Sequence, residues 1–152
     1  MLEQMQTEPS LIFKEIPYLG DGYQDVVAIR QAVLRTPIGL TLKEEEKQAD
    51  EGDVIIGAMC GSKMVGCIII RKHDETTCRL RQIAVLEEEQ NKGYGKSMIH
   101  FAEDLAKKSG FKNSYLFARH NAVQFYYKLG YRVVGEPFIE VGMPHIKMEK
   151  SL

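Results

Sequence analysis

The feature that most restricts how this chain can fold is the segment from Arg81 to Leu105, where the residue pattern changes twice. An apolar, strand-like run, Leu80-Arg-Gln-Ile-Ala-Val85, is followed by a polar loop that ends in Gly93-Tyr94-Gly95. Beyond the loop, apolar residues recur at the spacing of one helix face: Met98, Ala102, Leu105 and Ala106. The segment therefore predicts a strand, a tight loop and a helix, with the glycines at the helix N-terminus.

A glycine-containing loop at a helix N-terminus has two interpretations. The first amide N–H groups of a helix have no partner within the helix, and the helix dipole places partial positive charge there. Glycines let a ligand approach the backbone closely, and Lys92 and Lys96 add positive charge. These properties are typical of a phosphate-binding loop. A simple turn between a strand and a helix has the same pattern, and geometry alone does not choose between the two.

Two nucleotide-binding motifs fail at this loop. Gly95-Lys96-Ser97 supplies the end of a P-loop, but the first glycine that this motif requires falls on Gln90. The dinucleotide fingerprint needs a third glycine where the chain has Met98, and the segment after the expected helix, 111–118, contains no acidic residue. A nucleotide phosphohydrolase is therefore disfavoured.

The rest of the chain predicts a mixed sheet with helices packed on it. Closely spaced apolar runs joined by short polar turns predict an antiparallel meander in the middle of the chain. Asp21 to Gln24 resembles a capping box at the start of a helix that ends at Thr36-Pro37. Expected strands cover 10–16, 53–60, 63–72, 77–86, 112–118, 131–136 and 145–150, and further helices cover 43–50, the stretch up to Ser109, and 121–129. A loop holding Pro137, Gly142 and Pro144 is expected between the last two strands.

Size and charge restrict the class of protein. The 152 residues suit a single domain, 1–152, in which 1–9 is expected to be a flexible lead-in. Twenty Lys and Arg balance twenty-one Asp and Glu, which argues against nucleic acid as a partner. The longest apolar run, Ile68-Ile69-Ile70, is far too short to span a membrane. The N-terminus lacks the pattern of a signal peptide, so a cytoplasmic location is expected.

The cysteines Cys60, Cys67 and Cys78 are odd in number and match neither a zinc site nor a disulfide framework. All three lie in strand-like segments. We therefore expect small buried side chains in a reducing compartment, and no metal site.

Two segments resemble one known family. Gln90-Asn-Lys-Gly-Tyr-Gly95 fits the pattern Arg/Gln-x-x-Gly-x-Gly/Ala, directly after a strand. Ala122-Val-Gln-Phe-Tyr126-Tyr-Lys-Leu-Gly130-Tyr131 is similar to an Ala-x-x-x-Tyr-x-x-x-Gly-Phe/Tyr segment. Both resemble the GNAT superfamily of acyl-CoA N-acyltransferases, and the order of elements matches over nearly the whole chain. The resemblance implies an α+β fold, with a mixed, mostly antiparallel sheet of about six or seven strands and about four helices.

The resemblance also implies a cofactor site for acetyl-CoA. The pyrophosphate is expected on the amides of the loop, and the pantetheine arm is expected to pair with the backbone of Ile83 and Val85. An N–H near Ile83 or Ala84 would polarise the thioester carbonyl. The implied loop residues are Gln90, Asn91, Lys92, Gly93, Tyr94, Gly95 and Lys96. One departure is Arg119, which stands where many relatives carry an asparagine, so Asn121 is not assigned a cofactor role.

The implied reaction is direct transfer of an acetyl group to an amine in a ternary complex. Tyr126 is the candidate acid for the departing thiolate, and the alternative is that it only fills the core. His145 is the candidate base, although it could instead be structural, and Glu140 could hold a cationic acceptor. Ordered water could also remove the proton. A covalent route through Cys78 is disfavoured, because no His or Lys neighbours it in sequence.

The acceptor and the assembly stay open. Family resemblance places the acceptor pocket near residues 34–40, where Ile38 and Leu40 lie close to Arg30 and Arg35. The runs Glu44 to Glu46 and Glu87 to Glu89 are interpreted as solvated faces. A polyamine, an amino sugar, an amino acid, a drug or a protein amine would all suit the chemistry. A homodimer is possible, and the alternative function is a non-catalytic module that binds CoA.

Overall fold

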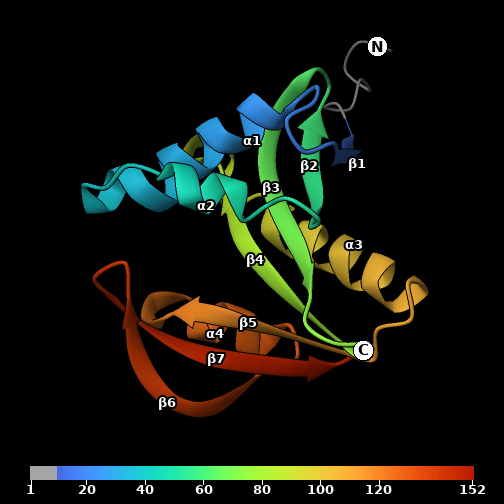
Figure 1. The fold of residues 1–152 in the computed structure, drawn as a ribbon, viewed down its shortest axis with the longest axis vertical. Helices are drawn as coiled ribbons and strands as arrows, with labels where there is room; N and C mark the ends of the chain where they lie inside the picture. The colour runs from blue at the N-terminus through green and yellow to red at the C-terminus, as the bar shows by residue number, and fades with distance from the viewer. Residues whose placement is uncertain (1–9) are drawn as a thin grey trace, which may run out of the picture.

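A computed structural model describes residues 10–152, and the expected lead-in, 1–9, lies outside the described residues. Seven strands form one sheet in the order β1-β2-β3-β4-β5-β7-β6 (Figure 1). The strands are β1 (Leu11–Ile16), β2 (Val54–Cys60), β3 (Lys63–Lys72), β4 (Thr77–Val85), β5 (Asn113–Arg119), β6 (Arg132–Glu140) and β7 (Met143–Ser151). The α-helices are α1 (Tyr23–Arg30), α2 (Glu44–Gln48), α3 (Tyr94–Lys108) and α4 (Val123–Lys128). The predicted α+β fold is confirmed.

The pairing of β4 with β5 is the topological feature that positions the site. These two strands are parallel, whereas every other neighbouring pair in the sheet is antiparallel. Their ladder covers only three residue pairs, from Thr77 with Asn113 to Arg79 with Tyr115. Beyond Arg79 the strands separate, β4 running towards α1 and α2 and β5 remaining with β7 (Figure 1).

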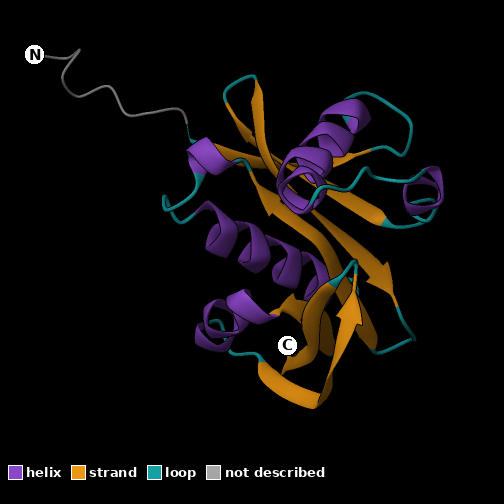
Figure 2. Ribbon diagram, turned by 90° about the vertical axis from the view of Figure 1, so that its left-hand side faces the viewer, coloured by secondary structure: helices purple, strands orange, loops and turns teal. Residues whose placement is uncertain are grey.

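Helices cover both faces of the sheet, which explains why β3 is apolar from Met64 to Ile70 (Figure 2). Ile68 and Ile70 belong to the core shared with α3, whose buried face includes Met98 and Ala102. Side chains of successive strand residues point to opposite faces, so Cys67 and Ile69 pack into a second core with α1. A strand buried on both faces has no room for polar side chains, and this is the pattern of residues 64–70.

The first helix differs from its prediction at both ends. Its N-cap is Gly22, with φ of +90° and no side-chain cap, so the predicted capping box at Asp21 to Gln24 is wrong. The α-helix ends at Arg30 and continues as a π-helical segment, Gln31–Arg35, and a 3₁₀ turn, Thr36–Ile38. Proline is tolerated at the first positions of a helical turn because its missing N–H has no acceptor there, so the chain stays helical past Thr36.

The last two strands are longer than predicted, and the predicted loop between them is wrong. Pro137 lies at an irregularity in the β6–β7 pairing, on the edge strand of the sheet. An edge strand tolerates proline because its missing N–H breaks no ladder. The strands join at Val141 and Gly142, whose φ values of +46° and +75° suit a tight two-residue hairpin turn. This hairpin brings the end of β6 beside the start of β7.

Candidate active site

A cleft of about 470 Å³ opens between the diverging strands β4 and β5. Its walls come from the π-helical segment Gln31–Arg35, α2, both strands, α4 and the β6–β7 hairpin. The candidate residues Ile83, Tyr126, Glu140 and His145 all line this cleft, although they lie far apart in sequence. The other lining residues are Leu34, Arg35, Glu45, Glu46, Ala49, Arg79, Leu80, Arg81, Gln82, Leu116, Phe117, Arg119, Ala122 and Val141.

A β-bulge in β4 lies at the cleft wall. Cys67 pairs with Ala84 and Ile69 with Arg81, so two β4 residues, Gln82 and Ile83, oppose the single residue between them on β3. Gln82 has a φ of +50°, which is rare for a residue with a side chain. A bulge leaves its extra residue outside the ladder and redirects neighbouring groups. The other edge of β4 has no paired strand beyond Arg79, so an extended ligand has an edge to pair with.

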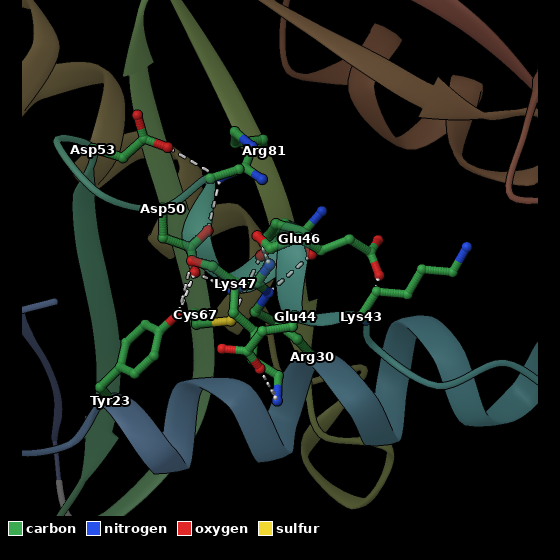
Figure 3. Close-up of polar contacts among 12 residues, drawn as sticks. Tyr23, Arg30, Lys43, Glu44, Glu46, Lys47, Asp50, Asp53, Cys67 and Arg81 are labelled. Carbon is green, nitrogen blue, oxygen red and sulfur yellow. Dashed lines mark hydrogen bonds and ion pairs between the residues drawn. The ribbon is translucent and has the colours of Figure 1, made fainter. Parts of the chain in front are cut away.

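A network of buried charged side chains contacts the bulge through Arg30, and Figure 3 shows the network. Arg30 donates from Nη1 to Asp50 Oδ2 at 2.5 Å, and both side chains are fully buried. Asp50 also accepts hydrogen bonds from the hydroxyl of Tyr23 at 2.5 Å and from Arg81 Nη1 at 3.1 Å. Arg30 Nε donates to Gln82 Oε1 at 2.9 Å. The network therefore links α1, the turn after α2 and the β4 bulge.

No sequence pattern predicted this network. Arg30, which was expected near the acceptor pocket, is the last residue of α1, is fully buried and does not line the cleft. The available signal was its position, one residue after Ile29 and four after Val26, on the buried face of the helix. Ile38 and Leu40 are not part of the lining either, whereas Leu34 and Arg35 are.

The glycine loop forms the N-terminus of α3. Gly93 is the N-cap with φ of +82°, and Ser97 N–H donates the first helical hydrogen bond to its carbonyl at 3.1 Å. A Cβ atom on Gly93 would meet nothing within 4 Å, so the positive φ, rather than crowding, favours glycine here. Gln90 Nε2 donates to the Val85 carbonyl at 2.9 Å and closes the loop onto the end of β4. The loop amides therefore follow directly from the strand that lines the cleft.

Tyr126 lies on α4, with 9% of its surface exposed, at the wall of the cleft. Its ring contacts Phe125 and Tyr131 edge to face, with centroid distances of 5.1 and 6.2 Å. Burial raises the pKa of its hydroxyl to about 12, against a smaller opposing effect of Arg119. The hydroxyl is therefore protonated at neutral pH, as a proton donor must be. The same contacts show that Tyr126 also contributes to the core.

His145 lies at the start of β7, almost fully buried, and its ring stacks on Phe138 at a centroid distance of 5.9 Å. Its Nδ1 is 2.9 Å from the carbonyl oxygen of Met143. A carbonyl accepts only, so Nδ1 is the donor, and in the neutral ring Nε2 is then an acceptor. Glu140 ends β6, across the hairpin, and is exposed at the cleft. The cleft thus holds candidates for both an acid and a base.

Known sequences similar to this chain indicate one family. The family model of the acetyltransferase (GNAT) domain matches residues 31–152. The chain belongs to the GNAT acetyltransferase family. The uncharacterized N-acetyltransferase YjcF of Bacillus subtilis is 30% identical over 129 residues, which cover 84% of this chain and 91% of that protein. The uncharacterized protein YyaT of the same organism is 33% identical over 76 residues, about half of each chain (50% and 51%).

Solved structures show the same GNAT fold. A putative N-acetyltransferase from Lactobacillus plantarum has a TM-score of 0.82 at 21% identity, covering 96% of this chain and 99% of that one. A GNAT family acetyltransferase from Elizabethkingia anophelis with acetyl-CoA bound has a TM-score of 0.75 at 19% identity, covering 93% and 98%. Together with the family match, this supports assignment of the chain as an acetyltransferase.

In this GNAT chain, Glu46 and Cys78 both lie in surroundings that bear on the predictions from sequence. The run Glu44 to Glu46 is not only a solvated face, because Glu45 and Glu46 line the cleft and Glu46 Oε1 accepts from Arg35 Nη2 at 2.5 Å. Cys78 is fully buried in the core against α3, where burial raises the pKa of its thiol to about 11. A thiol with a raised pKa is a poor nucleophile at neutral pH, which adds to the case against a covalent route.

Within residues 10–152 of this GNAT domain, no helix combines the length and apolar character needed to cross a bilayer. Over the same residues, no group of three or more His, Cys, Asp or Glu side chains is arranged to hold a metal ion.

Proposed function

We propose that this acetyltransferase moves an acetyl group from acetyl-CoA directly to the amine of an acceptor, with both substrates bound together. The observation that carries the proposal is the separation of β4 from β5. It leaves one edge of β4 unpaired next to a cleft that holds Tyr126 and His145, and the strand leads into the loop at the N-terminus of α3.

The residues present fit acetyl-CoA. The space around Gly93, where an added Cβ would meet nothing within 4 Å, leaves room for a phosphate against the loop. Amides of the loop from Asn91 to Lys96, with Gln90 bracing it, would hold the pyrophosphate at the positive end of α3. The backbone of Ile83 and Val85 would pair with the pantetheine arm. Acetyl-CoA supplies an activated acyl group as a thioester.

The side chains of the cleft suit the proton transfers of this reaction. At neutral pH the acceptor's amine is mostly in its ammonium form. His145 Nε2, or a water held by Glu140, takes a proton from it. The amine nitrogen would then bond to the acyl carbon as the carbonyl electron pair moves onto oxygen. When the carbonyl re-forms, the carbon–sulfur bond would break and the nitrogen would lose its second proton to solvent, from which Tyr126 regains the proton it gives to sulfur. An N–H at Ile83 or Ala84 stabilises the oxyanion, and the Tyr126 hydroxyl protonates the departing sulfur.

Binding and turnover of the purified protein test the proposal together. Titration calorimetry with acetyl-CoA should show binding, and thiol release from acetyl-CoA should depend on an added amine. Gly93→Asp should abolish binding, because it places a negative charge and bulk at the pyrophosphate. Gly110→Asp is the matched control: Gly110 follows the other end of α3, has φ of +99° and has equally open surroundings.

Normal binding of acetyl-CoA to Gly93→Asp would show that the loop assignment is wrong. Tight binding of CoA by the wild-type protein, with no thiol release across a broad amine panel, would instead indicate a non-catalytic CoA-binding module of the same fold.

A further inference from the structure

Four arginines line the cleft, and they differ in how their charge is balanced. Arg35 pairs with Glu46, and Arg81 pairs with Asp50 and Asp53, both at 3.1 Å. Within residues 10–152, neither of the other two, Arg79 and Arg119, is ion-paired. The cleft therefore contains two guanidinium groups whose charge no described carboxylate neutralises at contact distance.

Arg79 is held at the point where β4 and β5 separate. Its guanidinium carbon lies 4.4 Å from the centroid of the Phe117 ring, so the planar group stacks on the strand opposite. Its Nε is buried, and no hydrogen-bond partner for it exists among the described residues. Burial lowers the pKa of this guanidinium, and the neighbouring charge of Arg81 lowers it further. Arg79 is thus a partly desolvated cation that lacks a counter-charge.

Arg119 approaches the same cleft from the end of β5. Its Nη2 donates to the carbonyl oxygen of Leu34 at 2.8 Å, which ties the guanidinium to the π-helical segment that follows α1. A guanidinium has five N–H donors, so others stay available for a ligand. Burial lowers the pKa of Arg119, and the like charge of Arg35 lowers it further. Arg119 is therefore held in place by one hydrogen bond and repelled by its cationic neighbour.

The unpaired carboxylates of the cleft do not cancel these charges. Glu45 and Glu140 line the cleft, but both are exposed, so solvent screens them. Glu140 is near enough to favour the charged forms of Arg79 and Arg119, without forming an ion pair with either. The buried part of the cleft is therefore more positive than its rim.

We propose that this cleft selects small amines that also carry a carboxylate, and that Arg79 and Arg119 bind the carboxylate. The inference rests on the proposed function, since it names the acceptor class of the same site. A volume of about 470 Å³ suits a small molecule. An acceptor with several positive charges, such as a polyamine, meets repulsion here. The same positive field lowers the pKa of the acceptor's ammonium group and so favours the neutral amine that attacks.

Matched acceptors test the selectivity. Glycine, β-alanine and 4-aminobutyrate would each be compared with the corresponding amide, in which a neutral carboxamide replaces the carboxylate and the amine is retained. Since hydrogen bonds to charged groups are the strong ones, the best carboxylate should exceed its amide in kcat/KM by roughly tenfold to a hundredfold. Equal rates for acids and amides would overturn the proposal, and so would a preference for aminoalkylphosphonates over every carboxylate.

Variants of the two arginines test whether they bind the carboxylate of the acceptor. Arg79→Gln and Arg119→Gln should each raise KM for the best carboxylate by roughly tenfold or more while the Kd for acetyl-CoA stays unchanged. Arg132→Gln is the matched control, because Arg132 also stacks on an aromatic ring, 4.7 Å from the Tyr127 centroid, but outside the cleft. An unaltered KM in both cleft variants would overturn the assignment of these residues.

Acetyl-CoA binding tests the proposed function, and the dependence of acetylation on a carboxylate tests the acceptor class. If wild-type protein does not bind acetyl-CoA, the proposed function fails. If it acetylates amines without regard to their carboxylate, only the acceptor class is wrong. Should turnover be too slow to measure, calorimetry with N-acetyl-β-alanine and its amide in the presence of CoA decides the matter: loss of binding in Arg79→Gln supports the site, and unchanged binding overturns it.

Discussion

Arg30 donates a hydrogen bond from Nε to the side-chain oxygen of Gln82 at 2.9 Å, which ties α1 to the bulge in β4. Gln82 has a positive φ, and a residue with a side chain keeps such a conformation only where its surroundings hold it. Arg30 supplies part of that support while its Nη1 holds the buried carboxylate of Asp50. One buried side chain therefore positions both the turn after α2 and the strand at the cleft.

Arg30→Met should destabilise the protein by about 3 kcal/mol, because removing one partner leaves the buried charge of Asp50 undercompensated. Urea unfolding measures the free energy of unfolding. Arg132→Met, at an exposed arginine of β6, should cost far less. A loss below about 1 kcal/mol for Arg30→Met would show that Arg81 and Tyr23 suffice to satisfy Asp50.

Tyr126→Phe should lower kcat by about a hundredfold or more and leave the Kd for acetyl-CoA nearly unchanged, because it removes only the proton donor. Tyr127→Phe is the control, since Tyr127 is the next residue and is 52% exposed. Steady-state kinetics and calorimetry give the two quantities. An unchanged kcat in Tyr126→Phe would leave that side chain with its core role alone.

The pH profile carries a further prediction about Tyr126. A tyrosine that acts as an acid works below its pKa and fails as the pH rises through it. Burial raises this pKa from about 10 to about 12, so ionisation of Tyr126 should cause no loss of kcat between about pH 9 and 11. Rates measured over that range, in protein shown to be folded by circular dichroism, check this. A tyrosine-like loss centred near 10 that disappears in Tyr126→Phe would contradict it.

His145→Gln should reduce kcat/KM by about a hundredfold if Nε2 is the base, because glutamine cannot accept the proton. His100→Gln, on the exposed side of α3, is the control. The competing route through water held by Glu140 predicts the opposite pair of results: Glu140→Gln slow and His145→Gln near normal.

Thiol labelling tests the burial of the cysteines. Burial raises the pKa of Cys67 to about 12 and that of Cys78 to about 11, so neither should react with iodoacetamide in the native protein. Cys60 is partly exposed, and mass spectrometry should find label there first. All three should react in denaturant. Rapid native labelling of Cys78 would show that the core around α3 opens.

Local signals in the sequence predicted most of the fold. The strand, loop and helix from β4 to α3 was predictable because glycine spacing and helix periodicity act over a few residues. Gly110 and Gly130, which follow α3 and α4, have the positive φ that is typical of glycine after a helix. The extension of the last two strands to the turn after Glu140 was missed because prolines argue against a strand. Pro137 is accommodated by edge position and an irregular register, and Pro144 precedes the first residue of β7 that pairs with β5.

By itself, the sequence determined the glycine loop, the apolar runs that form the central strands and the resemblance to GNAT acyltransferases, because each depends on neighbours along the chain. Tertiary structure alone decided that the buried Arg30 side chain bonds to Gln82, and that Tyr126 and His145 share a cleft with Arg79 and Arg119. The physical reason is that burial and charge pairing depend on side chains that meet only when β4 separates from β5 and the helices pack against the sheet.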